Sequence, residues 1–589
     1  MPLNSLTEPL GRKRAAHLLR RACFGASPSE IDTFAALTPA EAIASLFNTN
    51  LPTPALPIDP VTGTEWITNG PTEDGSTNFE LEGVLNRWMI GQMIGVDVPE
   101  SQKLAYVFRE RIILFYHTLF TTKKSEVNDS RAIYYQNALF RIFAFDGNDV
   151  TVSNADPDLP DDVYVRNIKK LTEKISVDNA MLIFLDGRLN VNGNPNENYA
   201  RELLELYSVG RGLEGNIPEP EFDGDYFYFT EQDVQEGAKV LSGFDNDSTY
   251  GNIDIETGLP RGVVKGTTTA SRHDNSTKTF SQRFASATIS PNEELLLGTN
   301  ATEESVLEEI TQFVDLIYDQ NETALHICRR LYRFFVYHEI DASLQGTTIQ
   351  DMADILVANN FKIQPVLEAL LTSTHFYEAE DGVNDNKFGG LIKSPLDLIV
   401  GFIRNFDITV PSFSSDLTNF YEFTGSILSG MSQMGMDYYE PFEVAGYPAY
   451  HQFPIFNRSW ISPNYLTNRY SFIGSRLTVD EAMMGEVNVY DFFRSAIPIS
   501  TGASTESLVI TIAEYFLPVS EDLSFSTEGG ELTIERLSYF RQQILFDGNA
   551  DPETYWSERW TNGTSRDDIS QLLLQLINAM LQSPEYQLM

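Results

Sequence analysis

The stretch from Asn194 to Gly210 gives the clearest structural signal in the chain, because a helix start precedes a sharp division of polar and apolar residues. Asn194 can cap a helix, Pro195 suits a first helical turn, and Glu197 follows the cap by three residues. At about 100° per residue, polar side chains share one arc of this helix and apolar side chains fill the other. The polar arc holds Asn198, Arg201, Glu202 and Glu205, and the apolar side holds Tyr199, Leu203, Leu204, Leu206 and Tyr207.

Helical periodicity continues through most of the chain. Helices are predicted at 12–21, 29–47, 81–93, 101–121, 130–145, 161–184, 230–241, 305–336, 349–371, 395–406, 417–434, 463–477 and 490–496. Residues 211–229 and 244–290 are rich in Gly, Asp, Thr and Ser, which favours short strands or ordered loops. We therefore expect a mainly α, large multi-helix globular fold with a loop-rich or short-strand insertion around 211–290.

The chain is expected to divide into a helical core, residues 1–500, and a C-terminal segment, residues 501–589, that packs on it. Within it, residues 505–589 are predicted to form two or three helices. The aromatic and Pro-rich residues 435–462 are predicted to be ordered but not helical.

Composition limits what the protein can bind. A length of 589 residues is ample for a large core with two or three subdomains, and an apolar share of 42% excludes a disordered chain. The 83 acidic and 41 basic residues give a formal charge of −42, which disfavours nucleic acid and anionic lipid as partners. No stretch reaches the roughly 18 apolar residues that a membrane span needs, so no span is expected.

The N-terminal residues and the cysteines bear on the compartment. Met1 to Arg21 is polar and basic and lacks an apolar signal core, so the protein is either cytoplasmic or its signal has been removed. Neither Cys23 nor Cys328 belongs to a CxxC pair, which excludes a cysteine metal site. A disulfide between them stays open, but two buried free thiols are favoured because both lie in apolar helical contexts.

Glu197, Glu202 and Glu205 form the first candidate cluster. Two carboxylates facing a pocket can act as general acid and base, or as acid and nucleophile, when their surroundings separate their pKa values. Glu202 and Glu205 lie one helical turn apart and could instead share a cation. The competing interpretation is a solvated face on which Arg201 pairs with Glu197 and Glu205, each four residues away.

Histidines supply further candidates. His117 lies inside an apolar stretch, where it could be a neutral base, a metal ligand or an ordinary core residue with one hydrogen bond. His273 and Asp274 are adjacent, so the carboxylate could raise the pKa of the imidazole, or the pair could simply stabilise a loop. His451 lies among aromatic residues that include Trp460, which could form a groove for sugar stacking or a hydrophobic plug.

Several enzyme motifs are absent from the sequence: the Gly-x-Ser-x-Gly elbow, the phosphate loop, His-Glu-x-x-His and the dinucleotide fingerprint. Aspartates at 146–162 and 245–254 suggest Ca²⁺, but neither segment matches the twelve-residue calcium loop. Solvated acidic loops are the favoured interpretation of both.

Ten short landmarks follow one another along nearly the whole chain. They are 17–25 (HLLRRACFG), 115–120 (FYHTLF), 196–210 (NENYARELLELYSVG), 230–234 (TEQDV), 241–244 (LSGF), 273–274 (HD), 330–336 (RLYRFFV), 393–395 (KSP), 446–448 (GYP) and 583–586 (SPEY). Together they resemble a bacterial family called domain of unknown function 1800. The resemblance implies a periplasmic or extracellular protein, with its signal peptide absent from this sequence, often encoded beside a sulfatase-like protein. It implies no established reaction.

The chain departs from the pattern of that family at several landmarks. Members commonly have Glu-Leu-His-Thr-Leu-Gly where this sequence has Tyr207 in place of the His. Cys23 stands where Gly is usual, Asn275 and Ser276 replace an acidic-glycine pair, and Tyr447 replaces the Trp of a Gly-Trp-Pro element. A function that depends on the missing His or Trp is therefore not expected in this protein.

Our leading hypothesis is a hydrolase or lyase that acts on an extracellular polymer such as a polysaccharide. Its candidate catalytic residues are Glu202, Glu205, His117, His273 and Tyr207, and its candidate substrate-binding residues are Asn198, Arg201, Asp274 and Trp460. One alternative is a non-catalytic scaffold or glycan-binding partner of a sulfatase-like protein. Another is a metal-dependent hydrolase in which His117, Glu202 and His273 hold a divalent ion.

Overall fold

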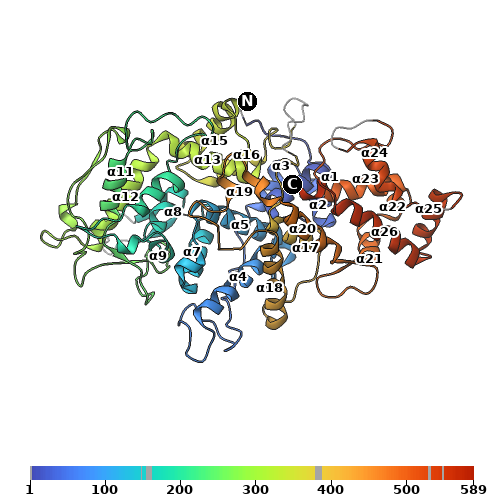
Figure 1. Cartoon of the computed structure of the whole chain (residues 1–589), viewed down its shortest axis with the longest axis horizontal. Helices are drawn as coiled ribbons and strands as arrows, with labels where there is room; N and C mark the ends of the chain where they lie inside the picture. Colours follow the sequence, from blue (N-terminus) through green and yellow to red (C-terminus); the bar gives the residue numbers. More distant parts are fainter. Residues whose placement is uncertain (1–2, 148, 154–161, 379–387, 528–531, 547–548) are drawn as a thin grey trace.

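The computed structural model describes residues 3–147, 149–153, 162–378, 388–527, 532–546 and 549–589. Helices dominate and the strands form only small two-stranded pairs, so the expected mainly α fold is confirmed (Figure 1). The N-terminal part contains α1 (Gly11–Cys23), α2 (Pro28–Ala35), α3 (Pro39–Leu46), α4 (Asn78–Ile94), α5 (Glu100–Leu119), α6 (Lys124–Val127) and α7 (Ser130–Phe143).

The central part follows with shorter elements. Its helices are α8 (Ile168–Ile175), α9 (Asn179–Phe184), α10 (Asn198–Glu202), α11 (Glu231–Val240), α12 (Glu303–Tyr318), α13 (Asn321–Phe335), α14 (Ala342–Leu344), α15 (Gln350–Ala358) and α16 (Ile363–Leu371). Two π-helical turns occur here, η2 (Leu203–Tyr207) and η5 (Gln345–Ile349). Each directly follows a short α-helix.

The remaining helices complete the core and form the C-terminal segment. They are α17 (Pro395–Asn405), α18 (Leu417–Gln433), α19 (Pro448–His451), α20 (Pro463–Gly474), α21 (Val489–Ala496), α22 (Ile499–Gly502), α23 (Thr505–Phe516), α24 (Ile534–Gln542), α25 (Pro552–Asn562) and α26 (Arg566–Leu581). The prediction of two or three helices in the C-terminal segment was wrong, because α23 to α26 are four separate helices.

Local capping explains why several predicted helices are split. Thr38 caps α3 through a capping box with Glu41, so the predicted helix 29–47 is two helices. The predicted helix 161–184 is likewise wrong: Asp178 caps α9, and the segment before α8 contains a strand. The prediction for 349–371 fails at Phe361, whose positive φ of 57° cannot continue a helix.

The insertion contains the predicted short strands. In it β3 (Phe244–Asp245) pairs with β4 (Val263–Val264), and β5 (Lys278–Thr279) pairs with β6 (Thr288–Ile289), both antiparallel. Elsewhere β1 (Val150–Val152) pairs antiparallel with β2 (Asp162–Tyr164), and β7 (Leu477–Thr478) pairs parallel with β8 (Val487–Asn488). Segment 435–462, predicted as non-helical, nevertheless includes α19 and a 3₁₀ turn, η6 (Phe456–Trp460).

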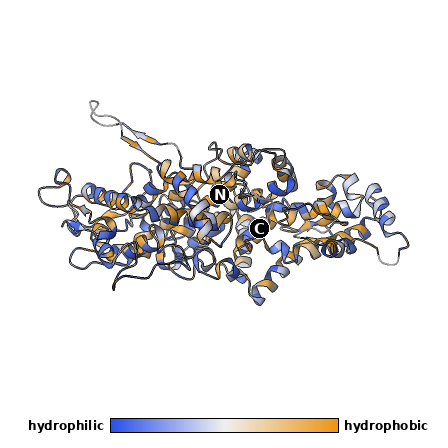
Figure 2. Cartoon of the chain, turned by 90° about the horizontal axis from the view of Figure 1, so that it is seen from above, coloured by the Kyte–Doolittle hydropathy of each residue, from blue (hydrophilic) through white to orange (hydrophobic). Residues whose placement is uncertain are grey.

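The molecule is elongated, with the insertion at one end and the C-terminal segment at the other (Figures 1 and 2). Helix α5 lies between them, and 14 of its residues are buried, including His117. At the C-terminal end, Phe516 of α23 stacks on Phe406 with ring centroids 4.9 Å apart. The division into a core of 1–500 and a segment of 501–589 stays a prediction.

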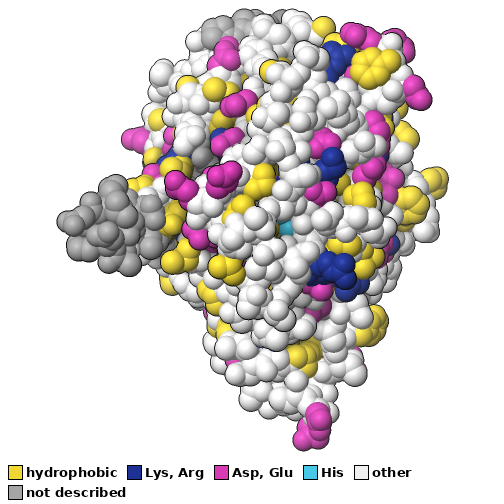
Figure 3. All heavy atoms as spheres, turned by 90° about the vertical axis from the view of Figure 1, so that its left-hand side faces the viewer, with side chains coloured by type: hydrophobic (Ala, Val, Ile, Leu, Met, Phe, Trp, Pro, Cys, Tyr) yellow, Lys and Arg dark blue, Asp and Glu magenta, His cyan; other side chains and the backbone are white. Residues whose placement is uncertain are grey.

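The surface charge and the state of the two cysteines match the expectations from the sequence. Acidic side chains outnumber basic ones on the face formed by the insertion end of the molecule (Figure 3). Cys23 and Cys328 are both buried free thiols, as favoured from the sequence. None of the described helices combines the length and apolar character needed to cross a membrane.

Candidate functional site

The segment from Asn194 to Gly210 builds its helix later than predicted. Helix α10 begins at Asn198, whose backbone N–H donates to the Asn196 side-chain oxygen at 3.0 Å, so Asn194 is not the cap. The apolar side behaves as expected: Tyr199 is buried and its hydroxyl donates to the Ile175 carbonyl at 2.7 Å. Leu203 and Leu204 are also buried. The hydrogen bond of Tyr199 ties α10 to the end of α8.

A π-helical turn follows α10 and changes the direction of the side chains. The Ser208 hydroxyl donates to the Leu203 carbonyl at 2.5 Å, and the chain leaves the turn at Gly210, which has a φ of +75°. A Cβ at Gly210 would lie only 2.5 Å from Nδ1 of His326. The ring of His326 also hydrogen-bonds the Leu206 carbonyl at 3.1 Å. Insertions of this kind in helices frequently occur at functional sites.

The charged residues of this segment, Glu197, Arg201, Glu202 and Glu205, form a stripe that is only partly ion-paired. Arg201 binds Glu231 at 2.7 Å and Glu197 at 3.4 Å, while Glu205 binds Arg211 at 2.8 Å. The predicted pairing of Arg201 with Glu197 is therefore confirmed, and the predicted pairing of Arg201 with Glu205 is wrong. The cause is the neighbouring insertion, which supplies Glu231 from α11.

Glu202 differs from its neighbours on the stripe. Among the described residues, nothing forms a hydrogen bond or ion pair with its half-buried carboxylate. Burial raises the pKa of Glu202 to about 7, and the negative charge of Glu205 adds to the shift. Arg201 and Arg211 oppose it without contacting the carboxylate. A carboxyl group with a pKa near neutrality can both donate and accept a proton.

Tyr207 lies on the buried side of the same turn. Its hydroxyl donates a long hydrogen bond, 3.4 Å, to the carbonyl of Thr121 just beyond α5. Burial raises the pKa of the Tyr207 phenol, the charge of Glu202 raises it further, and Arg330 opposes both. The phenol therefore stays protonated at neutral pH and lies within the electrostatic reach of a carboxyl and a guanidinium group.

Arg330 is a site residue that the sequence interpretation did not select. It is buried in α13, and its Nη2 donates to the Thr118 carbonyl at 2.5 Å. Burial lowers its pKa to about 10, with the charge of Arg333 acting in the same direction. Its positive charge also contributes to lowering the pKa of His451 to about 4, an effect due first to burial. The sequence feature that could have identified Arg330 is its position as an arginine on the apolar face of a strongly amphipathic helix.

His117 is fully enclosed near the end of α5. Its ring stacks on Tyr439 with centroids 3.9 Å apart, and Tyr438 and Tyr447 approach it edge-on. Neither ring nitrogen has a hydrogen-bond partner among the described residues, contrary to the single core hydrogen bond considered from the sequence. Burial lowers the pKa of His117 to about 3, so the imidazole is neutral at physiological pH.

His273 and Asp274 lie in a different polar cluster, inside the insertion. Nδ1 of His273 lies 2.9 Å from the Ser242 carbonyl and Nε2 lies 3.1 Å from Glu309. The buried amine of Lys278 binds the same Glu309 carboxylate and, at 2.6 Å, the Asp274 carbonyl. These contacts support the loop-stabilising interpretation of the His273–Asp274 pair.

The structure does not assemble the predicted metal centre. In the part of the chain that the structure describes, no group of three or more His, Cys, Asp or Glu side chains is placed to hold a metal ion. His117 is enclosed by tyrosines and His273 by the insertion cluster, so these two residues and Glu202 do not share an ion. The reason is topological: His117 belongs to the helical core, whereas His273 lies between β4 and β5 of the insertion.

Trp460 is not an open stacking platform. It is buried, with Tyr447 and Tyr450 at ring-centroid distances of 6.4 and 6.3 Å. This contradicts its predicted role in substrate binding and favours the hydrophobic plug. Asn198 is exposed and Arg201 partly exposed, although the Asn198 amide nitrogen donates to the Leu185 carbonyl at 3.3 Å.

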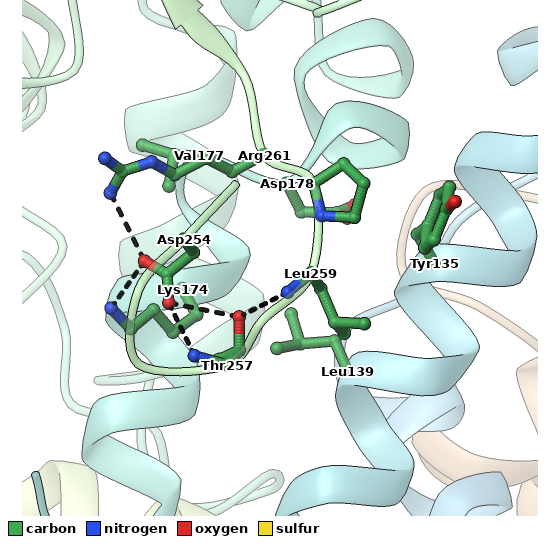
Figure 4. Close-up of a pocket in the computed structure, with 10 residues that line it drawn as sticks. Tyr135, Leu139, Lys174, Val177, Asp178, Asp254, Thr257, Leu259 and Arg261 are labelled. Atoms are coloured by element: carbon green, nitrogen blue, oxygen red, sulfur yellow. Dashed lines mark hydrogen bonds and ion pairs between the residues drawn. The ribbon is translucent and has the colours of Figure 1, made fainter. Parts of the chain in front are cut away.

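A separate cavity of about 20 Å³ lies between α7, α8 and the loop 254–261 (Figure 4). In it, the Asp254 carboxylate accepts from Lys174 at 2.8 Å and from Arg261 at 3.2 Å, and it also bonds Thr257. The oxygens of Asp254 are thus used to fold its own loop onto α8. Asp247 is bonded in the same manner to Thr249, so the described aspartates of 245–254 serve the loop. The other acidic segment, 146–162, falls largely outside the described residues.

Comparison with protein families agrees with this arrangement of landmarks. The family model described as "protein of unknown function (DUF1800)" matches residues 17–588. The chain belongs to this family. No curated protein and no solved structure matches it.

Four of the landmarks that characterise this DUF1800 chain meet at the carboxyl end of α5. Tyr207 and Arg330 both donate to carbonyls there, those of Thr121 and Thr118. The Gly446 backbone packs so closely that a Cβ would lie 2.8 Å from the Thr121 hydroxyl. Segments 115–120, 196–210, 330–336 and 446–448 thus form one site in space, although they are far apart in sequence.

Proposed function

We propose that this DUF1800 protein is an enzyme in which Glu202 acts as the general acid–base. The observation that supports this assignment is a half-buried carboxyl group that no described residue pairs with, on a stripe where the neighbouring carboxylates are paired. Its pKa of about 7 matches the requirement for proton transfer near neutral pH. A half-buried carboxyl group with no partner lowers the stability of the fold, so its presence favours a functional role.

Tyr207 and Arg330 complete the proposed chemistry. The phenol of Tyr207 remains protonated and cannot serve as a base at neutral pH. To donate to a substrate oxygen it must give up its long hydrogen bond to the Thr121 carbonyl. Arg330 supplies a fixed positive charge beneath the site. In a hydrolase Glu202 protonates the leaving oxygen while a water molecule attacks the carbon that loses it and releases a proton to solvent. In a lyase Glu202 removes the carbon-bound proton, the carbon–oxygen bond breaks as the double bond forms, and Glu202 returns the proton to the leaving oxygen, to which Tyr207 donates a hydrogen bond.

We further propose that the substrate is an extracellular polymer such as a polysaccharide, and that the protein works in the periplasm or outside the cell. The support is the exposed position of Asn198 on α10, four residues before Glu202, where its amide oxygen can accept from hydroxyl groups. The strongly acidic composition, with a formal charge of −42, suits a salty extracellular setting.

The decisive experiment is a polymer panel with the wild-type protein and two matched variants. Glu202→Gln removes the titrating carboxyl, whereas Glu197→Gln changes a carboxylate of the same stripe that is paired with Arg201. We expect Glu202→Gln to lose at least about 100-fold in kcat/KM and Glu197→Gln to stay within a few-fold of wild type. Full turnover by Glu202→Gln removes the assignment.

The second candidate function is a non-catalytic partner of a sulfatase-like protein or a glycan-binding scaffold. The ion pairs of Arg201 with Glu231 and of Glu205 with Arg211 favour it, since they resemble an ordinary solvated face. Stable co-purification with such a partner, combined with no turnover on any polymer, would support this role and exclude the enzymatic one.

A further inference from the structure

Two hollows flank the loop 217–226 of the insertion. One has a volume of about 470 Å³ and the other about 550 Å³, and residues 221–224 line both. The loop therefore forms the ridge between them. Volumes of this size are typical of sites that bind a ligand.

The hollows adjoin the proposed active site. Arg211 and Tyr226 line the larger one, and Glu231 lines the smaller one. The Tyr226 hydroxyl donates to Glu231 at 2.9 Å and accepts from Arg201 at 2.9 Å. Because Arg201 directly precedes Glu202 in α10, a chain that lies in the hollows passes beside the helix that carries the proposed acid–base.

Aromatic rings are exposed along this loop. Phe222 lines both hollows and is 55% exposed. Phe453 is 52% exposed and reaches the residues just before the loop, since a Cβ at Gly215 would lie 3.2 Å from its ring. Exposed apolar side chains that lie near one another mark a binding surface, and a flat ring can pack on the C–H face of a sugar without any charge.

The charges of the lining are unsuited to a polyanion. Its two arginines are already ion-paired: Arg211 binds Glu205 at 2.8 Å, and Arg283 binds Asp225 at 2.9 Å. Asp223 is exposed and forms no hydrogen bond or ion pair with any described residue. The carboxylates of the lining are Glu221, Asp223, Asp225 and Glu231. A chain with carboxylate or sulfate groups would therefore meet like charge and find no unpaired cation among the described lining residues.

The lining does not select a cationic chain either. The formal charge of −42 belongs to the whole protein, so its attraction for a polycation is not specific to the hollows. An exposed carboxylate such as Asp223 contributes little to the binding of a single cation. The rings of Phe222 and Phe453 remain the contacts that distinguish this surface.

We propose that the two hollows bind an uncharged polysaccharide chain, the substrate on which Glu202 acts. This inference rests on the proposed function and narrows it. Elimination needs a carbon-bound proton made acidic by a neighbouring carboxyl group, which an uncharged sugar chain lacks, so the reaction is hydrolysis. Water adds to the anomeric carbon and loses a proton to solvent as the glycosidic carbon–oxygen bond breaks. Glu202 gives its proton to the leaving oxygen and is reprotonated from solvent.

The test is an array of uncharged glucan and mannan oligosaccharides, each beside its C6-oxidised counterpart, which has the same backbone with added carboxylates. Binding of the full chain is measured at constant ionic strength. We expect at least one uncharged oligosaccharide to bind at least about 10-fold more tightly than its oxidised counterpart. Phe222→Ala should weaken that binding about 10-fold. Phe79→Ala is the matched control, since it removes a ring of α4 that is 78% exposed and lines neither hollow, and it should leave binding unchanged.

A charge reversal in the loop tests the same inference in the opposite direction. Asp223→Lys places an unpaired cation in the lining and should tighten the binding of the oxidised oligosaccharide by about 3-fold or more. Unchanged binding of the oxidised oligosaccharide by this variant would show that the charges of the lining do not select the substrate.

Three results would overturn the proposal: equal binding of uncharged and oxidised oligosaccharides, no binding of any uncharged oligosaccharide, or equal binding by Phe222→Ala and Phe79→Ala. Glu202→Gln separates this inference from the proposed function. Turnover retained in Glu202→Gln, with binding weakened in Phe222→Ala, removes the role of Glu202 but keeps the binding site. Turnover lost in Glu202→Gln, with binding unchanged in Phe222→Ala, keeps the role of Glu202 and removes the binding site.

Discussion

At the scale of single residues, the property that distinguishes Glu202 is the absence of a partner among the described residues. Glu197 and Glu205 on the same stripe form ion pairs, whereas burial and the charge of Glu205 act on Glu202 with no such pair to offset them. The sequence identified Glu202 as a candidate through helical spacing. The sequence did not show that Arg201 forms an ion pair with Glu231, because Glu231 belongs to α11, about 30 residues further along the chain.

The raised pKa of Glu202 has a consequence for stability. Its ordinary value is 4.5 and its folded value about 7, so between these pH values the native protein holds a proton that the unfolded chain releases. Stability from this group therefore falls as pH rises through that window and stays lower above it. We expect Glu202→Gln to be more stable than wild type at pH 8 by about 1–2 kcal/mol after allowing for solvent screening, but not at pH 4. Thermal melts at both pH values measure this, and an unchanged difference between them contradicts it.

At the scale of elements, the sequence located the helical segments but not all of their boundaries, because 29–47, 161–184 and 305–336 each contain two helices. It failed where a turn depends on tertiary contacts. The π-turn Leu203–Tyr207 has the same composition as a helix, and Gly210 just beyond it packs closely against His326. The sequence also did not predict that four landmarks meet at the end of α5. Periodicity identifies the apolar face of each helix but not which helix packs against that face.

Gly210→Ala tests the packing of that turn. The substitution combines a positive φ with a Cβ 2.5 Å from His326, so we expect a loss of about 2–3 kcal/mol in the free energy of unfolding. Gly193→Ala is the matched control: its φ is +81° but nothing lies within 4 Å of the added Cβ, so strain alone should cost about 1 kcal/mol. Equal losses in chemical denaturation would show that contact with His326 does not determine the turn.

The cluster in the insertion gives a second element-scale prediction. Glu309→Gln leaves the buried amine of Lys278 without its counter-charge and should lower stability by about 3 kcal/mol. The double variant Lys278→Met/Glu309→Leu removes both charges and should lose less than the sum of the single variants Lys278→Met and Glu309→Leu. Strictly additive losses in thermal unfolding would mean that the two charges are not coupled.

At the scale of the whole molecule, the C-terminal segment 501–589 is held by side chains of the N-terminal half. Arg12 of α1 binds Glu514 at 2.8 Å, and the Tyr515 hydroxyl donates to Asp32 at 2.7 Å. We expect a chain ending at residue 500 to be insoluble or loosely folded, because Phe406 and the adjoining face of α1 lose their cover. A soluble truncated protein with sharp thermal unfolding would instead show that residues 1–500 fold independently.

The mainly α architecture and the position of the insertion followed from periodicity and composition, whereas the site chemistry depended on burial. His117 illustrates the limit: the sequence located it in an apolar helix, but only the structure shows its ring enclosed by Tyr438, Tyr439 and Tyr447, with both nitrogens unbonded among the described residues. Trp460 shows the same limit in the opposite sense, because an aromatic-rich segment predicts a platform or a plug equally well.

The central claim is that Glu202 is a carboxyl group with a pKa near neutrality. The most direct measurement is a ¹³C NMR titration of protein labelled at the glutamate carboxyl carbon, with Glu202→Gln used to assign the resonance. We predict that the resonance lost in the variant titrates with a midpoint near pH 7. A midpoint near 4.5, the ordinary value, would contradict the role of Glu202 as the general acid–base.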